Sequence, residues 1–382
     1  MAAPKSCVQC GKCLEVCPLF KVTGREELTP RAKFFLESLR SGEDPGEGLS
    51  EKDFKSLASL CLSCGRCAKN CPQSMSGPDM VSNLRAKSKG FIQTCWDLWL
   101  ISPGLLWPMA AAASKLSPEV LPEPFGSARK RMQALFAKSP EPWVELSLQA
   151  KFEKRKVMLF KGCVGRFART DWTAKAERIM DGMGLIRAEG GEFGCCGSSH
   201  GSAGLLGRQI EARAKNIKVW KDSGYPLLVT FCATCLKGLK EYTLDDFAGD
   251  EELLAKWNEA LTPLSSLLLD AEPKLLDNAP VQVAYHQPCH APRNDTDLKL
   301  VALIAGERLR QVQNDLCCGF GGIMQLGAPE LSKEVGLHSL EHLTKGMKPG
   351  GQIVSGCSAC VIQLVTLVKD DYFASHWLDI LK

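Results

Sequence analysis

Cysteine is the residue that most constrains this chain, because eighteen of its nineteen cysteines fall into four regularly spaced sets. Two sets of four repeat one spacing near the N-terminus, and two sets of five repeat another spacing farther on. The sets are Cys7, Cys10, Cys13 and Cys17; Cys61, Cys64, Cys67 and Cys71; Cys163, Cys195, Cys196, Cys232 and Cys235; and Cys289, Cys317, Cys318, Cys357 and Cys360. Only Cys95 is left over. Grouped thiolates are typical of iron–sulfur proteins, so the pattern predicts a protein that moves electrons.

The length and composition predict a globular protein of two or three domains. The chain has 382 residues, of which 45% are hydrophobic and 24% charged, and its formal charge of +4 does not indicate nucleic-acid binding. The first cysteine stands at position 7, which leaves no room for a signal peptide, so we expect a cytoplasmic protein. A secreted disulfide scaffold fits poorly, because such scaffolds are short.

Each N-terminal set has the spacing Cys-x2-Cys-x2-Cys-x3-Cys-Pro, the ligand run of bacterial two-cluster ferredoxins. In that run three cysteines bind one cubane, and the fourth, just before proline, binds the other cluster. The pattern therefore predicts two crossed ligand sets for two [4Fe-4S] cubanes. These are Cys7, Cys10, Cys13 and Cys71, and Cys61, Cys64, Cys67 and Cys17. Zinc also binds Cys-x2-Cys pairs, but it does not explain why the Cys-Pro step occurs twice.

Helices are expected between and after these runs. Thr29-Pro30 predicts the start of a helix over residues 31–39, and residues 51–60 predict a second helix. Residues 1–90 thus resemble the α-helical ferredoxin domain of membrane-associated dehydrogenases.

Residues 91–155 are expected to form a helical apolar linker. Its apolar run from Leu98 to Ala113 is short for a bilayer span and contains two prolines. We expect it to be buried against protein, with contact to a membrane surface as the alternative.

Strands and helices alternate from about residue 156. We expect residues 156–270 and 271–382 to be two tandem α/β domains, each with a small parallel sheet and with its cysteines on loops at the strand ends. Equivalent cysteines are offset by 126, 122, 125 and 125 residues, which indicates a duplication. The second copy is four residues shorter before its Cys-Cys pair, and we expect this shortening in a loop near residues 294–297.

Both copies end in Cys-Cys-Gly and Cys-x2-Cys, and they resemble the cysteine-rich "CCG" domain of heterodisulfide reductases. The resemblance implies one or two further [4Fe-4S] clusters of an open, noncubane type, each held by five cysteines. Gly197 and Gly319 are expected to provide the unusual backbone conformation of the Cys-Cys turn. His200, His286 and His290 lie near ligand cysteines; we interpret them as hydrogen-bonding or packing residues, with ligation or proton delivery as the alternative.

The order of two ferredoxin runs, a helical linker and two CCG repeats resembles the iron–sulfur subunit of glycolate oxidases and related D-lactate dehydrogenases. The small subunit of anaerobic glycerol-3-phosphate dehydrogenase and the D subunit of heterodisulfide reductase are cousins of this family. The resemblance implies an electron-transfer subunit that is inactive alone. It would take electrons from an FAD-containing dehydrogenase subunit that oxidises a 2-hydroxy acid and pass them to quinone or another acceptor. Peripheral membrane contact is part of this expectation.

Two other interpretations stay open, and no catalytic residue is assigned from the sequence. In the first, a noncubane cluster reduces a disulfide directly, as the resemblance to heterodisulfide reductase implies. In the second, the cysteines bind zinc in a scaffold protein.

Overall fold

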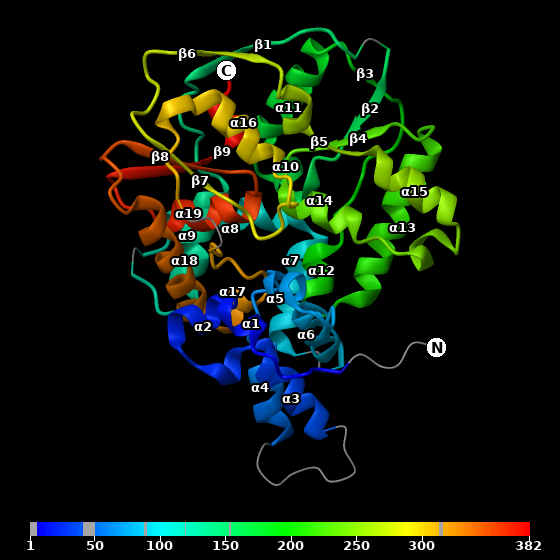
Figure 1. Cartoon of the computed structure of the whole chain (residues 1–382), viewed down its shortest axis with the longest axis vertical. Helices are drawn as coiled ribbons and strands as arrows, with labels where there is room; N and C mark the ends of the chain where they lie inside the picture. Colours follow the sequence, from blue (N-terminus) through cyan, green and yellow to red (C-terminus); the bar gives the residue numbers. More distant parts are fainter. Residues whose placement is uncertain (1–5, 41–49, 88–89, 119, 153, 313–315) are drawn as a thin grey trace.

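The computed structural model describes residues 6–40, 50–87, 90–118, 120–152, 154–312 and 316–382. Helices occupy one end of the molecule, and two small parallel sheets lie toward the other end (Figure 1). The N-terminal helices, drawn in blue, lie below the sheets in this view.

Short helices separated by cysteine loops make up the N-terminal region. They are α1 Lys12–Glu15, α2 Pro18–Thr23, η1 Glu26–Leu28, α3 Pro30–Arg40, α4 Glu51–Ser59, α5 Arg66–Asn70 and α6 Gly77–Lys87. Before α3, the Thr29 hydroxyl accepts a hydrogen bond from the N–H of Ala32 at 3.4 Å, and Pro30 takes the first helical position. Ser50 caps α4 by accepting from the N–H of Asp53 at 3.2 Å. The two helices predicted in this region are thus confirmed.

Three further helices, α7 Phe91–Ile101, α8 Pro103–Leu116 and α9 Phe125–Leu135, form the linker. The apolar run is divided between α7 and α8, since Pro103 begins a new helix. The rings of Trp99 and Trp107 stack across the junction with centroids 5.7 Å apart. No helix in the described part of the chain has the length and apolar character needed to cross a bilayer.

The first α/β domain contains a four-stranded parallel sheet in the order β3-β2-β4-β5. Its elements are β2 Lys156–Leu159, α10 Gly162–Phe167, α11 Thr170–Gly182, β3 Ile186–Arg187, α12 Ser198–Ser202, α13 Leu206–Asp222, β4 Leu227–Thr230, α14 Ala233–Lys240, η2 Leu244–Phe247, α15 Glu251–Ala260, β5 Leu261–Pro263 and η3 Leu264–Leu268. Strand β4 is buried along its whole length, as expected for a strand covered by helices on both faces.

The second domain has the same strand order, in a parallel sheet β7-β8-β9. A parallel bridge between Val283 and Leu309 takes the place of the pairing between β2 and β3. Its elements are β7 Val283–His286, α16 Thr296–Ala305, η4 Gly306–Arg308, α17 Met324–Gly327, α18 Pro329–Thr344, β8 Gly351–Ser355, α19 Ser358–Leu367, β9 Tyr372–His376 and η5 Trp377–Ile380. The small parallel sheet expected in each copy is present.

The place predicted for the four-residue shortening is wrong. Helix α11 begins seven residues after Cys163, and α16 begins seven residues after Cys289, so the intervening loops have equal length. Instead, α16 has 10 residues where α11 has 13, and the segment from the helix end to the Cys-Cys pair is one residue shorter. The helix itself absorbs most of the difference.

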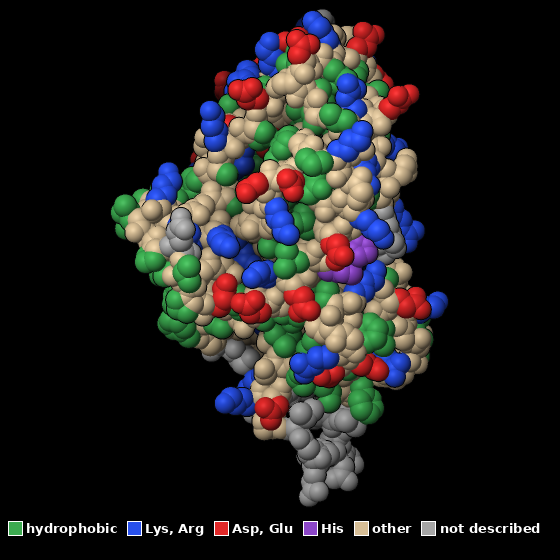
Figure 2. Space-filling view, turned by 90° about the vertical axis from the view of Figure 1, so that its left-hand side faces the viewer, with side chains coloured by type: hydrophobic (Ala, Val, Ile, Leu, Met, Phe, Trp, Pro, Cys, Tyr) green, Lys and Arg blue, Asp and Glu red, His purple; other side chains and the backbone are tan. Residues whose placement is uncertain are grey.

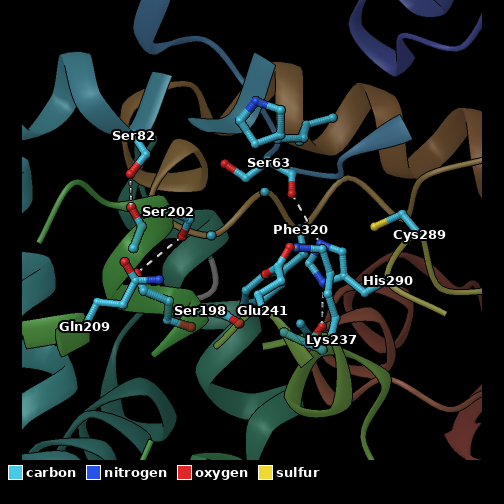
Figure 3. Close-up of a pocket in the computed structure, with 18 of the residues that line it drawn as sticks. Ser63, Ser82, Ser198, Ser202, Gln209, Lys237, Glu241, Cys289, His290 and Phe320 are labelled. Atoms are coloured by element: carbon cyan, nitrogen blue, oxygen red, sulfur yellow. Dashed lines mark hydrogen bonds and ion pairs between the residues drawn. The ribbon is translucent and has the colours of Figure 1, made fainter. Parts of the chain in front are cut away.

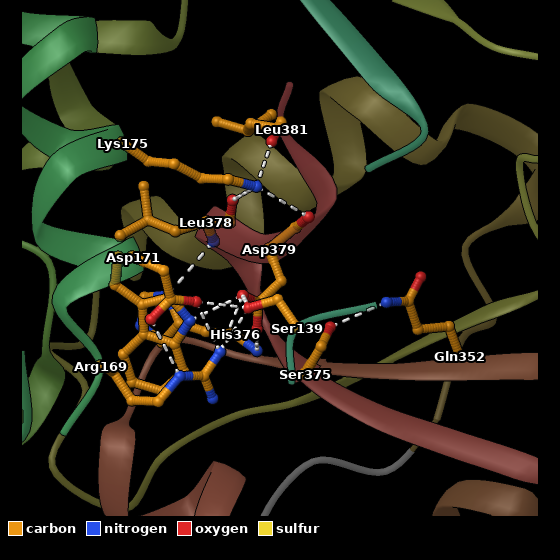
Figure 4. A network of polar contacts seen from close by, with 11 residues as sticks. Ser139, Arg169, Asp171, Lys175, Gln352, Ser375, His376, Leu378, Asp379 and Leu381 are labelled. Atoms are coloured by element: carbon orange, nitrogen blue, oxygen red, sulfur yellow. Dashed lines mark hydrogen bonds and ion pairs between the residues drawn. The ribbon is translucent and has the colours of Figure 1, made fainter. Parts of the chain in front are cut away.

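The two α/β domains share one hydrophobic core, which includes Trp172, Trp220 and Trp257 of the first and Trp377 of the second. Strand β1 Val144–Ser147 of the linker pairs antiparallel with β6 Glu272–Leu275. The C-terminal segment lies against α11, where Asp379 accepts hydrogen bonds from Trp172 Nε1 at 2.6 Å and from Arg169 at 3.2 Å (Figure 4). These contacts fix the positions of the two cysteine sets relative to each other.

Candidate metal centres

The first three cysteines, Cys7, Cys10 and Cys13, line a small cavity together with Cys71. Cys67 lines both this cavity and the neighbouring one. Cys71 is the last cysteine of the second run, and it follows α5 directly. The four thiols therefore come from two loops that are far apart in the sequence. We call this group site A.

The second group, site B, consists of Cys61, Cys64, Cys67 and Cys17, which line a neighbouring small cavity. Lys33 of α3 also lines it and is only 2% exposed. Its ammonium donates hydrogen bonds to the carbonyl oxygens of Leu28, at 2.8 Å, and Leu60. Burial lowers the pKa of Lys33, while the adjacent thiols of Cys61 and Cys17 act in the opposite direction. This cation can offset part of the negative charge that thiolates bring to site B.

In the first α/β domain, one set of five thiols forms site C. The expectation that its cysteines lie on loops is only partly correct, because Cys163 and Cys235 lie in the first turns of the helices α10 and α14 that follow β2 and β4. Cys195 and Cys196 lie in the loop before α12, and Cys232 precedes α14. Neighbouring thiols lie within hydrogen-bonding reach in the order Cys163, Cys195, Cys196, Cys235 and Cys232. Gly197 has a φ of +90°, as expected from the Cys-Cys-Gly motif. Gly238 of α14 is needed for another reason: a Cβ atom there would lie 3.0 Å from the sulfur of Cys196 and 2.2 Å from Ser198 Oγ.

The second domain forms the equivalent set, site D. Here the thiols follow one another in the order Cys289, Cys317, Cys318, Cys360 and Cys357. Gly319 has a φ of +81°, as expected. His286, the last residue of β7, lies beside this set: its ligand nitrogen and the sulfurs of Cys318 and Cys360 are all within 4.8 Å of one another. Burial lowers the pKa of His286 to about 4, so its imidazole is neutral near pH 7.

Sites C and D touch each other. The thiols of Cys232 and Cys357 lie within hydrogen-bonding reach, and Thr234 Oγ1 lies 3.1 Å from the sulfur of Cys357. The backbone joins the same loops, because the N–H of Ala233 donates to the carbonyl oxygen of Gly356 at 2.8 Å. The ten thiols thus form one continuous row across the boundary between the domains.

Site D also adjoins site B. Cys64 and Cys317 belong to one buried cluster, and burial together with Cys317 raises the pKa of the Cys64 thiol well above its ordinary value. Helix α5 anchors this contact. Arg66 donates to the carbonyl oxygen of Leu316 at 3.0 Å, and Lys69 donates to that of Cys289 at 2.9 Å.

At the other end of the series, site A lies close to site B. Burial raises the pKa of the Cys13 thiol in site A, and the nearby Cys17 thiol of site B raises it further. The spatial order of the four sites is therefore A, B, D, C. It differs from their order along the chain.

The other two histidines singled out from the sequence differ in their contacts. His290 follows Cys289 of site D and links this site to its two neighbours. Its Nε2 lies 3.2 Å from the carbonyl oxygen of Ser63 in the loop of site B, and its Nδ1 lies 3.0 Å from Thr234 Oγ1 in the segment of site C. His200 on α12 is 6% exposed, and its Nδ1 has no hydrogen-bond partner among the described residues.

Two cavities reach the five-cysteine sites. A polar cavity of about 640 Å³ is lined by thiols of site D and by Ser63, Lys237, Glu241 and His290 (Figure 3). An apolar cavity of about 400 Å³ is lined by all five thiols of site C and by aromatic and aliphatic side chains of α7, α8 and α9. Its aromatic lining residues are Trp96, Trp99, Trp107 and Phe320.

The donor chemistry of the four sites fits iron–sulfur clusters. Burial raises the pKa of Cys67 to about 12, and contact with Cys317 raises that of Cys289 to about 12. Buried thiols grouped this closely would repel one another as thiolates, and positively charged iron removes that cost while displacing their protons. Sites A and B offer four thiols each, which suits a cubane, whereas sites C and D offer five.

Family comparisons agree with this donor arrangement. Residues 3–75 match the model of the 4Fe-4S dicluster domain, and residues 157–240 and 283–365 both match that of the cysteine-rich domain. The chain belongs to the cysteine-rich CCG-domain family of iron–sulfur proteins. The two CCG matches contain the thiols of sites C and D, and the dicluster match contains those of sites A and B.

Individual relatives of this CCG protein are distant but cover most of its length. The glycolate oxidase iron-sulfur subunit of Escherichia coli (strain K12) is 25% identical over 402 residues, 99% of this chain and 93% of that protein. The probable glycolate oxidase iron-sulfur subunit of Bacillus subtilis (strain 168) is 24% identical, covering 86% of this chain and 82% of that protein. The D subunit of the dihydromethanophenazine:CoB–CoM heterodisulfide reductase of Methanosarcina mazei is 23% identical, covering 86% and 80%.

The sequence did not indicate several polar residues that hold the sites together. Lys33, Arg66, Lys69 and Thr234 each contact a ligand loop, yet none of them is a defining residue of a motif. Arg66 and Lys69 lie inside the second ferredoxin run, and this position is the only signal in the sequence that could have drawn attention to them.

Proposed function

We propose that this protein is the iron–sulfur electron-transfer subunit of a flavin-dependent 2-hydroxy-acid dehydrogenase acting on glycolate or D-lactate. Electrons would enter from an FAD-containing partner protein and leave to quinone or another acceptor. The names of the Escherichia coli and Bacillus subtilis relatives support this assignment, since both are iron–sulfur subunits of glycolate oxidase.

The continuous series of sites A, B, D and C carries the proposal. Each site contacts the next through thiols or ligand loops: Cys13 with Cys17, Cys64 with Cys317, and Cys357 with Cys232. A protein that used its clusters only for stability would not need them in one row from end to end. We assign cubane [4Fe-4S] clusters to sites A and B and noncubane [4Fe-4S] clusters to sites C and D, which together supply one-electron redox chemistry when bound.

The apolar cavity at site C supports an exit at this end of the series. Its walls are mostly apolar, and three tryptophans of α7 and α8 line it. Such a cavity fits the ring and the isoprenoid chain of a quinone better than it fits a charged acceptor. The exposed apolar side chains of α7 and α8 support a peripheral membrane contact, which would bring a lipid-soluble acceptor to the cavity.

The test is to assay the isolated chain and its complex with the flavoprotein partner for reduction of a quinone analogue by glycolate and by D-lactate. We expect roughly 16 iron atoms per chain if all four sites hold four-iron clusters. We also expect no turnover by the chain alone and turnover by the complex. Hydroxy-acid oxidation by the flavin-free chain would overturn the proposal.

A second function, direct reduction of a disulfide, is favoured by the polar cavity at site D. Thiols of that site line the cavity together with Lys240 and with two cations that are paired with carboxylates, Lys237 with Glu241 and Arg213 with Asp246. Two electrons and two protons would convert the bound disulfide into two thiols. The assay uses reduced viologen as donor with a panel of carboxylated or phosphorylated disulfides. Turnover that is lost in Cys317→Ser but kept in Cys95→Ser would establish this function, and the absence of turnover across the panel would exclude it.

A further inference from the structure

His286 carries a buried nitrogen with no partner. The side chain is 2% exposed, and no residue that the structure describes forms a hydrogen bond with its Nε2. A buried polar atom without a hydrogen bond destabilises the folded state, so such an atom calls for an explanation. A ring nitrogen of His286 and the sulfurs of Cys318 and Cys360 lie within 4.8 Å of one another.

The hydrogen bonds on the other side of the ring determine which nitrogen bears the proton. Ser355 Oγ donates its single proton to the carbonyl oxygen of His286 at 3.0 Å. Ser355 Oγ also lies 3.3 Å from Nδ1 of His286, and with its proton already used it can only accept. Nδ1 therefore carries the hydrogen, and Nε2 presents a free lone pair. A nitrogen with a free lone pair can bind a metal ion, but it has no hydrogen to donate to a cluster sulfide.

The first domain lacks this nitrogen. Cys163 and Cys289 are offset by 126 residues, and the same offset places Phe160 at the position of His286. Phe160 is fully buried, and its ring lies against Phe193 with centroids 5.4 Å apart. Sites C and D thus offer the same five thiols, but only site D has an imidazole at this position.

We propose that Nε2 of His286 binds an iron of the cluster at site D, beside Cys318 and Cys360. The inference rests on the proposed function to the extent that site D holds iron. Donors that share one tetrahedral metal lie about 3.6 Å apart, so small side-chain shifts bring the three atoms to a common ion. Imidazole is an accepted ligand of iron, and at site D it would add to the five thiols and replace none of them. Site D therefore differs from site C in electronic structure as well as in position.

The test is pulsed EPR on the reduced, cluster-loaded chain labelled with ¹⁵N-histidine, without any flavoprotein. We expect a nitrogen coupling of the strength that directly bound imidazole gives, present in the wild type and in His290→Gln. It should be absent in His286→Phe, which copies the Phe160 environment of site C. The same variant should shift the midpoint potential of one cluster and leave those of the others unchanged.

Three results would overturn the inference. One is a wild-type spectrum without directly bound nitrogen, which needs no variant to fold. Another is a coupling that survives in folded His286→Phe. The third is zinc at site D in place of iron. The first two leave the electron-transfer proposal intact, whereas a chain without iron would remove both.

Discussion

Asp379 carries a buried charge that joins the two α/β domains. Its side chain is 1% exposed and pairs with Arg169, which is 6% exposed. Trp172 Nε1 and the N–H of His376 also donate to this carboxylate. Removing one partner of a buried pair leaves an uncompensated charge, which is more costly than the net gain from forming the pair.

We expect Asp379→Ala to lower the free energy of unfolding by about 3–5 kcal/mol. The matched control is Asp181→Ala, which removes the partner of Arg187 where both side chains are 51% exposed, and it should cost less than about 1 kcal/mol. Thermal and denaturant unfolding of the anaerobically prepared variants measures both effects. Equal destabilisation by the two changes would contradict the importance of this buried charge.

We expect the buried His376 to make the stability of the protein depend on pH. Burial lowers its pKa to about 4, and both ring nitrogens are used, since Nε2 lies 3.1 Å from the carbonyl oxygen of Phe231 and Nδ1 accepts from the N–H of Leu378. The unfolded state binds a proton near pH 6.5 and the folded state does not. The free energy of unfolding is therefore unaffected by His376 above pH 6.5. It decreases as the pH falls from 6.5 toward 4, by up to about 3 kcal/mol, because protonation favours the unfolded state.

The comparison with His376→Gln isolates this titration from acid damage to the clusters, because both proteins share that damage. The difference in melting temperature between wild type and variant should shrink on going from about pH 7.5 to about pH 5. A difference that does not change with pH would show that His376 does not titrate in this way.

At the scale of single residues, the sequence predicts which cysteines group together, but it does not predict which groups contact each other. The spacing of the cysteines identifies which thiols share a loop, because that depends on local geometry. It does not identify which loops face each other, so the contact of Cys232 with Cys357 could not be predicted. His286 was singled out only by its nearness to Cys289, and its free nitrogen depends on Ser355, which lies 69 residues away.

Among the elements, α7 and α8 stand out for their exposed apolar side chains. Phe91, Leu98, Leu105, Met109 and Leu116 are each between 55% and 89% exposed. Hydrophobic side chains gather along the left edge of the molecule in Figure 2, while charged ones are spread over its upper part. Contiguous exposed apolar surface marks an interaction site, and the exposed Lys115 and Lys130 nearby suit anionic lipid.

We expect the protein to float with vesicles that contain phosphatidylglycerol. Leu105→Glu combined with Met109→Glu should reduce binding at least about tenfold, because both side chains are 60% or more exposed and lie one turn apart on α8. Val281→Glu, at a side chain 63% exposed elsewhere, is the control and should bind normally. Equal binding of all three proteins would place the membrane contact, if there is one, on another surface.

The predicted elements were those with a strong local signal. The two helices predicted by their residue ranges, α3 and α4, carry the cap residues Thr29 and Ser50 directly before their first turns. The ribbon of β1 and β6 was missed because its partners lie more than 120 residues apart. Strand β5 was missed because it is short and contains Pro263, which a sheet tolerates at its edge, where β5 lies.

For the whole molecule, the spatial order A, B, D, C has a consequence that the chain order does not predict. Site D lies between the N-terminal sites and site C, so electrons that enter at the ferredoxin end reach site C only after site D. The sequence predicted four sites and their ligands but not this order, which depends on how α5 contacts the loops of Cys289 and Leu316.

The order can be tested by interrupting the series at two points. We expect Cys195→Ser with Cys196→Ser to stop quinone reduction while sites A, B and D remain reducible by the flavoprotein and substrate. Cys317→Ser with Cys318→Ser should also stop turnover, but it should in addition leave site C oxidised. Freeze-quenched EPR of the complex follows each cluster. Reduction of site C at the wild-type rate in the site D variant would contradict the serial order.

Unchanged turnover in a folded variant of both Cys-Cys pairs would show that the clusters of sites C and D are structural. The electrons would then leave the protein from the N-terminal sites.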